Sequence, residues 1–162
     1  MARETVALTV AMAGIPEVDE ALLSRLAKEF GWSFGRVQGI PEVARLNAGT
    51  ELVAVLFSPQ GLGLPWEQAL KAVQEAAPLA LPIVCHRFAE QIEWPEFAEA
   101  GVFHALRLPL HLSEVRQSLG FVREAEARRV ARSIGDLKKL RTAVGRAARE
   151  ETSPKLVAAP RA

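Results

Sequence analysis

Five short apolar runs alternate with five segments of helical periodicity over residues 5–122, and this alternation constrains the fold more than any other feature. The runs are short and rich in β-branched residues, which is typical of buried strands; they lie at 5–11, 33–37, 51–57, 81–86 and 102–108. The intervening segments repeat apolar residues every three or four positions, which predicts amphipathic helices; they lie at 18–30, 41–49, 66–77, 94–101 and 114–122.

Strands that alternate with helices in this way pair in parallel, because a parallel connection needs a crossover of a dozen or more residues. Such crossovers are right-handed, so the chain is expected to form a doubly wound α/β sheet. The economical arrangement is a five-stranded parallel sheet of the flavodoxin-like type, which would occupy residues 1–122. A chain of 162 residues has room for one such domain and an appendage.

The charge distribution separates the body of the chain from its tail. Residues 1–122 contain nine lysine and arginine residues and 14 acidic ones, a net charge of −5, whereas residues 123–162 contain 11 and five, a net charge of +6. We therefore expect a long, basic amphipathic helix at 123–151 with a role of its own. The segment 152–162 has two prolines and no periodicity, which predicts a disordered tail.

A narrow apolar seam runs along the predicted basic helix. Val130, Ile134, Leu137 and Val144 follow alternating steps of three and four residues once the interrupting Arg141 is counted. This heptad-like spacing is typical of a helix that pairs with another helix. It predicts a protein partner, most simply a second copy of the chain; a single long helix that folds back on the domain is the alternative.

Three segments of the body together resemble receiver domains of the response-regulator family. ELVAVLFSPQGLGLPWEQALKAVQEAAP resembles the third strand, loop and helix of a receiver, and LPIVCH resembles the fourth strand. EFAEAGVFHALRLPLHLSEVRQSLGFV resembles the end of a receiver, with Ala-Gly before the fifth strand and a residue plus proline after it. The resemblance covers about residues 4–125 and implies a receiver scaffold.

The resemblance also implies a set of phosphotransfer residues, and this sequence lacks them. A receiver holds Mg²⁺ with an acidic pair after the first strand, and phosphorylates an aspartate that ends the third. A hydroxyl after the fourth strand and a lysine before the proline bind the phosphoryl oxygens. The matching positions here are Ala13 for the acidic pair, Leu56 or Phe57 for the aspartate, His86 or Arg87 for the hydroxyl and Leu108 for the lysine. We therefore expect a degenerate receiver without metal, cofactor or aspartyl phosphorylation.

Other chemistry-bearing residues do not form a recognisable site. Gly61 and Gly63 lack the third glycine and the first-strand context of a dinucleotide-binding turn. Cys85, the only cysteine, lies in an apolar run and is expected to be buried and structural. Adjacent strand residues point to opposite faces, so Cys85 and His86 are not expected to bind one metal ion. No nucleophile, base and orienting group can be assembled, and the chain is not expected to be an enzyme.

These features predict a non-phosphorylatable signalling or scaffold module that acts through protein–protein interaction and dimerisation. One alternative is a sensor that binds a small molecule or nucleotide at the carboxyl edge of the sheet, near Ala13, Ser58, His86 and Leu108. Another is a transcription regulator that contacts nucleic acid through the basic helix, although five acidic residues dilute that signal. The absence of a signal peptide and of any run of about 20 apolar residues predicts a cytoplasmic protein without membrane contact.

Overall fold

The computed structural model describes residues 8–87 and 94–152, and the chain divides into two compact units. The first unit is Met1–Arg123 and the second is Glu124–Ala162. The predicted disordered tail at 152–162 lies almost entirely outside the described residues. No helix in the described ranges is long and apolar enough to cross a membrane.

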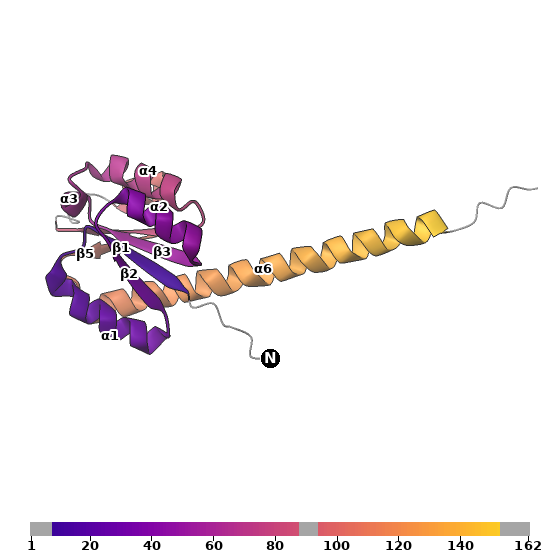
Figure 1. The fold of residues 1–162 in the computed structure, drawn as a ribbon, viewed down its shortest axis with the longest axis horizontal. Helices are drawn as coiled ribbons and strands as arrows, with labels where there is room; N and C mark the ends of the chain where they lie inside the picture. The colour runs from indigo at the N-terminus through magenta and orange to yellow at the C-terminus, as the bar shows by residue number, and fades with distance from the viewer. Residues whose placement is uncertain (1–7, 88–93, 153–162) are drawn as a thin grey trace, which may run out of the picture. The chain divides into compact units, whose positions relative to one another are not determined.

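The first unit is built around one parallel sheet of five strands (Figure 1). The strand order is β2-β1-β3-β4-β5, which confirms the predicted doubly wound arrangement. The strands are β1 Thr9–Ala13, β2 Ser33–Val37, β3 Leu52–Phe57, β4 Leu81–His86 and β5 His104–Arg107. Four strands fall inside or close to the predicted ranges, because their apolar runs are bounded by clear turn residues.

The first strand differs from its prediction, which placed it at residues 5–11. It continues through Met12 and Ala13, both buried, and ends where Gly14 adopts a φ of +70°. Ala13 is paired with Val37 of β2 and with Phe57 of β3, so pairing on both sides carries the strand beyond residue 11. Residues 5–7 lie outside the described range.

Helices cover both faces of the sheet, as the crossover connections require (Figure 1). They are α1 Glu20–Phe30, preceded by the 3-10 turn η1 Glu17–Asp19, then α2 Ile40–Gly49, α3 Pro59–Leu62, α4 Trp66–Ala76, α5 Trp94–Ala100 and α6 Leu112–Thr152. The short helix α3 lies in a segment predicted to be a loop. The hydroxyl of Ser58 accepts a hydrogen bond from the Gly61 N–H at 3.2 Å, which caps this single turn.

Helix α6 is continuous, whereas the sequence predicted one helix capped by Ser113 and a second one from residue 123. It begins at Leu112, so Ser113 lies in its first turn. Gly120 lies within this stretch without ending the helix, and no proline follows it before residue 154.

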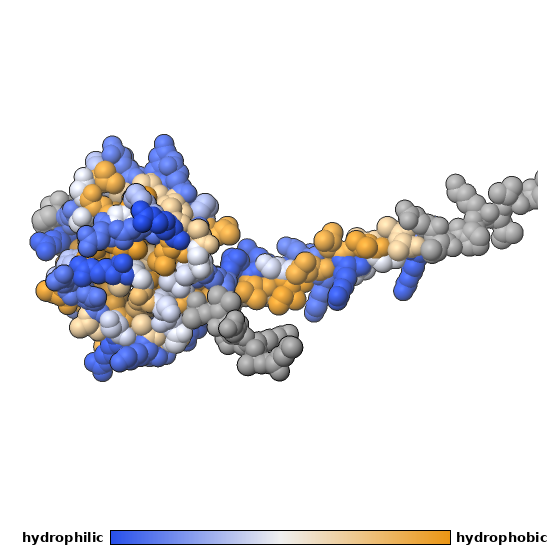
Figure 2. Space-filling model, in the orientation of Figure 1, coloured by the Kyte–Doolittle hydropathy of each residue, from blue (hydrophilic) through white to orange (hydrophobic). Residues whose placement is uncertain are grey.

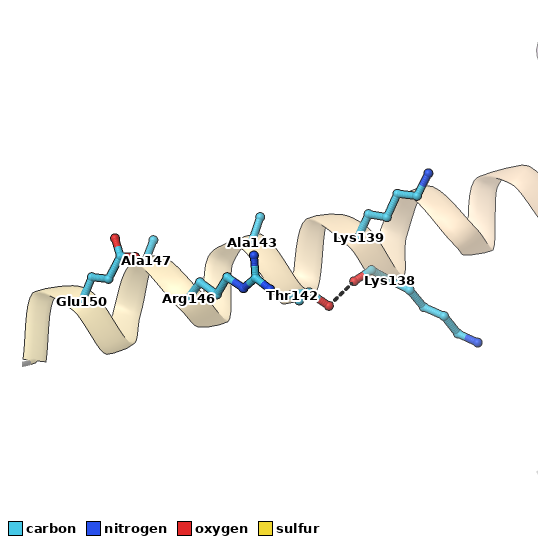
Figure 3. Close-up of a pocket in the computed structure, with 7 residues that line it drawn as sticks. All are labelled: Lys138, Lys139, Thr142, Ala143, Arg146, Ala147 and Glu150. Atoms are coloured by element: carbon cyan, nitrogen blue, oxygen red, sulfur yellow. Dashed lines mark hydrogen bonds between the residues drawn. The ribbon is translucent and has the colours of Figure 1, made fainter.

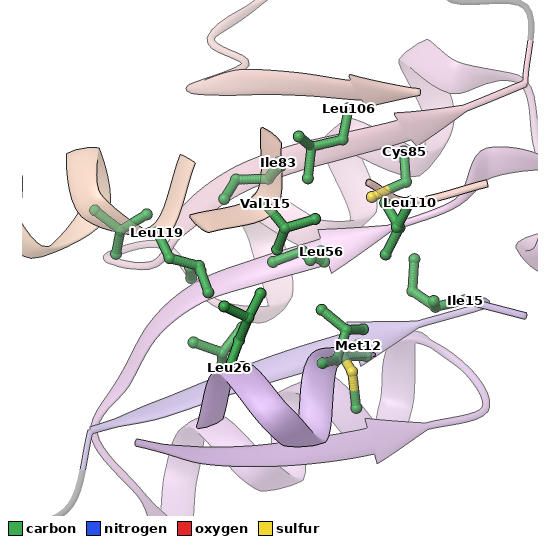
Figure 4. Close-up of a cluster of buried hydrophobic side chains, with 14 of the residues drawn as sticks. Met12, Ile15, Leu26, Leu56, Ile83, Cys85, Leu106, Leu110, Val115 and Leu119 are labelled. Atoms are coloured by element: carbon green, nitrogen blue, oxygen red, sulfur yellow. The ribbon is translucent and has the colours of Figure 1, made fainter. Parts of the chain in front are cut away.

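The sheet separates two apolar clusters, because successive side chains of a strand point to opposite faces. One cluster packs α1 and the first turns of α6 against the sheet through residues such as Leu26, Leu56, Ile83, Val115 and Leu119 (Figure 4). The other cluster packs α2, α4 and α5 against the opposite face; it includes Val43, Phe57, Val73, Val84 and Phe97. Cys85 is fully buried in the first cluster, as expected for a structural cysteine.

Candidate functional site

The carboxyl edge of the sheet carries the positions that the sequence resemblance matches to the phosphorylation site of a receiver domain. Ala13 and Phe57 end the neighbouring strands β1 and β3 and are paired across them. Both side chains are fully buried on the face covered by α2 and α4. Leu56 points to the opposite face and is equally buried, so either register puts an apolar side chain in the position that matches the acceptor aspartate.

The ends of β4 and β5 lie next to this pair. His86 ends β4, and its carbonyl oxygen accepts a hydrogen bond from the Leu108 N–H at 3.3 Å. Partial burial lowers the pKa of His86 from its ordinary value, so this imidazole is neutral near pH 7. Leu108 is buried in the apolar cluster and precedes Pro109 through a cis peptide bond. The position that the sequence resemblance matches to the phosphate-binding lysine therefore holds a packed hydrocarbon side chain.

A pocket of about 390 Å³ opens at this edge. It is lined by Gly14, Pro16, Ser58, Gln60, Gly61, Arg87 and Leu108. Of the predicted edge residues, the structure places Ser58 and Leu108 at the pocket, and it places Arg87 rather than His86 there. Among the described residues that line it, the one charged group is the Arg87 guanidinium, so they offer a cation where Mg²⁺ would require carboxylate oxygens.

Two glycines bring the loops after β1 and β3 into direct backbone contact. A Cβ atom on Gly61 would overlap the carbonyl oxygen of Gly14 and lie 2.9 Å from its Cα atom. Gly14 in turn has a φ of +70°, a conformation that L side chains rarely adopt. The two loops therefore close on each other at the edge of the sheet. Within the described ranges, no three His, Cys, Asp or Glu side chains are grouped in a way that could hold a metal ion.

Asp19 is a buried carboxylate near this edge that sequence reasoning missed. Its Oδ1 atom accepts a hydrogen bond from the Leu110 N–H at 3.1 Å, which ties the start of α1 to the loop before α6. Its Oδ2 atom is buried and has no hydrogen-bond partner among the described residues. Burial raises the pKa of the Cys85 thiol, and the charge of Asp19 raises it further. The thiol is therefore protonated and unreactive at neutral pH.

Comparisons with known proteins place this geometry among receiver domains. The signal receiver domain of an HD domain-containing protein from Pseudomonas fluorescens Pf-5 is 16% identical and superposes with a TM-score of 0.58 over 79% of this chain and 98% of its own. A receiver domain protein from Clostridium thermocellum is 12% identical, with a TM-score of 0.60 over 75% and 97% of the two chains. The chain has the receiver fold.

The receiver fold alone does not establish what the chain does. A putative CpaE2 pilus assembly protein from Sinorhizobium meliloti 1021 also superposes, with 14% identity and a TM-score of 0.55 over 70% of this chain and 98% of its own. No family model and no curated protein sequence matches the chain. Function must therefore be argued from the sites that the scaffold carries.

The second unit carries the predicted seam as an exposed apolar surface along α6 (Figure 2). The exposed fractions are 45% for Val130, 49% for Ile134, 64% for Leu137 and 62% for Val144. Leu140 is 62% exposed and belongs to the same surface, although its spacing sets it beside the seam and the sequence reading passed over it. Ile134, Leu137, Leu140 and Val144 line one shallow groove together with Lys138 and Arg141.

The apolar seam of the second unit does not continue the stripe that α6 presents to the domain core. Val115, Leu119 and Val122 are fully buried in that core. The next positions of the same stripe are Glu126 and Arg129, which form an ion pair with a 2.6 Å N–O distance. Each seam residue lies one position after the matching position of the buried stripe, which turns the seam by about 100° around the helix axis. The seam is therefore a second apolar face of α6, distinct from the one that packs in the core of the first unit.

Apart from Arg141, which lies within the seam, the basic residues of the second unit lie beside and behind it. Lys138, Lys139 and Arg146 line a shallow groove with Thr142, whose hydroxyl donates to the Lys138 carbonyl oxygen at 2.9 Å (Figure 3). Towards the start of the unit, Arg128 forms an ion pair with Glu124 at 3.4 Å, and Arg129 forms an ion pair with Glu126. These pairs reduce the positive potential that a nucleic acid would meet. Nucleic-acid binding stays a prediction.

An aromatic patch lies where α5, β5 and α6 meet. The His104 ring packs edge-on against Trp94 and Phe121, with centroid distances of 6.3 and 6.0 Å. Its Nδ1 atom lies 2.9 Å from the buried Ser118 hydroxyl. Burial lowers the pKa of His104, and the charge of Glu114 opposes that shift. Trp94 and Phe121 remain 47% and 42% exposed, so this patch is a second apolar surface of the molecule.

Proposed function

We propose that this chain is a receiver-fold signalling or scaffold module that cannot be phosphorylated and that acts through protein–protein contacts. The observation that carries the proposal is the pairing of Ala13 with Phe57 at the ends of β1 and β3. Phosphotransfer needs carboxylates at that edge, and the side chains there are buried hydrocarbon. The proposal includes the absence of enzymatic activity.

The contact surface in this proposal is the seam of α6, and its first partner is a second copy of the chain. Exposed leucine, isoleucine and valine side chains at heptad spacing are stabilised when a facing helix covers them. The patch formed by Trp94, His104 and Phe121 offers a further surface for other proteins. The exposed fractions of the seam residues support this role, because an apolar surface of this length is unfavourable in water.

Two measurements on the full chain test the proposal. Light scattering is expected to give a dimer, and the double substitution Ile134→Ser with Leu137→Ser should yield a monomer. Arg132→Ser, on the side of α6 away from the seam, is the matched control and should stay dimeric. A monomeric wild-type chain would contradict the pairing and would favour a helix that folds back on its own domain.

Phosphorylation is tested separately, by intact-mass measurement after incubation with acetyl phosphate and Mg²⁺. We expect no phosphoryl adduct, because no described carboxylate lines the edge pocket. An adduct that is lost on treatment with hydroxylamine would indicate an acyl phosphate and would overturn the proposal that the module is non-phosphorylatable.

A second candidate function rests on the edge pocket itself. Arg87 is the charged residue that lines this pocket of about 390 Å³, and its cation suits a small anionic ligand better than a metal ion. A thermal-shift screen with nucleotides should then raise the melting temperature of the wild-type chain and leave Arg87→Ala unchanged. Equal shifts in both proteins, or none, would reject this function.

A further inference from the structure

The seam contains one charged residue, and its position bears on how two copies can pair. In heptad terms, the a positions are Ala127, Ile134, Arg141 and Ala148, and the d positions are Val130, Leu137 and Val144. Arg141 therefore stands in the core of any two-helix pair that uses this seam. A polar residue at one a position selects among orientations and registers, at some cost in stability.

A parallel, in-register pair brings like charges together. Each a residue then faces the same residue of the second copy, so the two Arg141 guanidinium groups would share one layer of an apolar core. No acidic residue lies within 138–149, and no carboxylate of that segment can offset the two charges. Juxtaposed like charges at an interface cost several kcal/mol.

An antiparallel pair avoids this contact, because each a residue then faces a d residue. One register places Ile134 opposite Leu137 of the second copy and Ala127 opposite Val144 of the second copy. Arg141 then faces Val130 of the second copy, and the two Arg141 residues lie about 16 Å apart along the axis. The largest apolar side chains, Ile134 and Leu137, meet at the centre of the pair. Towards each end, the small Ala127 side chain faces Val144 of the second copy.

The charges along the second unit favour the same orientation. Residues 138–149 hold five cations, namely Lys138, Lys139, Arg141, Arg146 and Arg149. In this register they face residues 122–133 of the second copy, which hold the acids Glu124 and Glu126 together with four arginines. Antiparallel pairing places the cationic half beside the half that contains the carboxylates, whereas parallel pairing places it beside an identical cationic half.

We propose that α6 pairs antiparallel with a second copy of itself, with Ile134 and Leu137 at the centre and Arg141 excluding the parallel arrangement. This inference rests on the proposed dimerisation and specifies its geometry. The surface concerned is the groove lined by Ile134, Leu137, Leu140 and Val144. Its occupant is the same groove of the second copy, in the opposite direction.

Disulfide formation between introduced cysteines tests the orientation in the full chain. Cys85 is fully buried and its thiol stays protonated, so the wild-type chain should form no covalent dimer under mild oxidation. Ala127→Cys and Val144→Cys are prepared as separate single variants. In the antiparallel pair, like cysteines lie about 25 Å apart along the axis, beyond the reach of a disulfide. Unlike cysteines face each other, so only an equimolar mixture of the two variants should give covalent dimers.

The matched control is Arg132→Cys, which lies on the outer side of the helix and should form no covalent dimer alone or in the mixture. Covalent dimers in each single-variant sample would show parallel pairing and would overturn the orientation, while the proposed dimer would stand. A dimer by light scattering without disulfides in the mixture would overturn this register and leave dimerisation intact. A monomer by light scattering, without disulfides in any sample, would remove the proposed dimer and this inference together.

Discussion

Helix α6 carries two apolar stripes of similar composition in very different surroundings. Val115, Leu119 and Val122 are fully buried, whereas Ile134 and Leu137 are 49% and 64% exposed in the same helix. The first stripe completes the core of a receiver-fold domain, and the second has no cover among the described side chains. Helical periodicity therefore marks an apolar surface that needs a cover, and it does not specify which part of a protein covers it.

The largest effect is expected from shortening a buried leucine of the first stripe. Leu119→Ala should lower the free energy of unfolding by about 2–5 kcal/mol, because it leaves a cavity in a filled core. Chemical denaturation of the full chain measures this loss. A loss below about 1 kcal/mol would mean that the stripe is less tightly packed than its burial indicates.

The same substitution in the second stripe should separate pairing from folding. Leu137→Ala is expected to leave the unfolding of the domain nearly unchanged and to weaken the dimer about a hundredfold, since two leucine side chains are lost per pair. Sedimentation equilibrium gives the dissociation constant. An unchanged constant would show that this stripe is not the interface.

The backbone contact between Gly14 and Gly61 predicts a loss of stability that has a different cause, namely steric overlap. Gly61→Ala should cost about 1–3 kcal/mol of stability, because the added methyl group forces the loops after β1 and β3 apart. Gly49→Ala is the control, since a Cβ atom there meets nothing within 4 Å. Equal melting temperatures for the two variants would contradict the contact between Gly14 and Gly61.

A smaller effect, of opposite sign, is expected within the seam. Arg141→Leu should tighten the dimer roughly tenfold, because an apolar residue replaces a charge that the pair must desolvate. It should also let single-cysteine variants form parallel covalent dimers. Weaker pairing after this substitution would indicate that Arg141 makes a favourable contact across the interface.

The smallest expected effect is the pH dependence of folding stability, and it should concern the first unit alone. Burial lowers the pKa of both His86 and His104, so the unfolded chain binds protons at a higher pH than the folded one. Their stabilising contribution is complete above about pH 6.5 and is lost as the pH falls below it. The melting temperature of the wild type should be slightly lower at pH 5.5 than at pH 7.5. The difference should be smaller for His104→Asn. The seam contains no histidine, so the dimer constant should not change over this range.

Most of the fold followed from local patterns. The apolar runs at 33–37 and 81–86 became β2 and β4 without change, because a strand's period and its bounding turns are written in neighbouring residues. The sequence also predicted that phosphotransfer residues are missing, because neither Leu56 nor Phe57 can accept a phosphoryl group, and this stays a prediction. The sequence missed Asp19, which resembles an ordinary residue at a helix start until its contact with Leu110 is seen.

Local patterns in the chain were enough to predict the order of the elements, the apolar side chains at the strand ends and the seam, because each depends on residues close together in the sequence. The folded chain was needed to show that Gly14 contacts Gly61, that Arg87 lines the pocket and that Asp19 accepts a hydrogen bond from the loop before α6. These contacts join residues far apart in sequence. They depend on how loops pack once the sheet has formed, and no local periodicity carries that information.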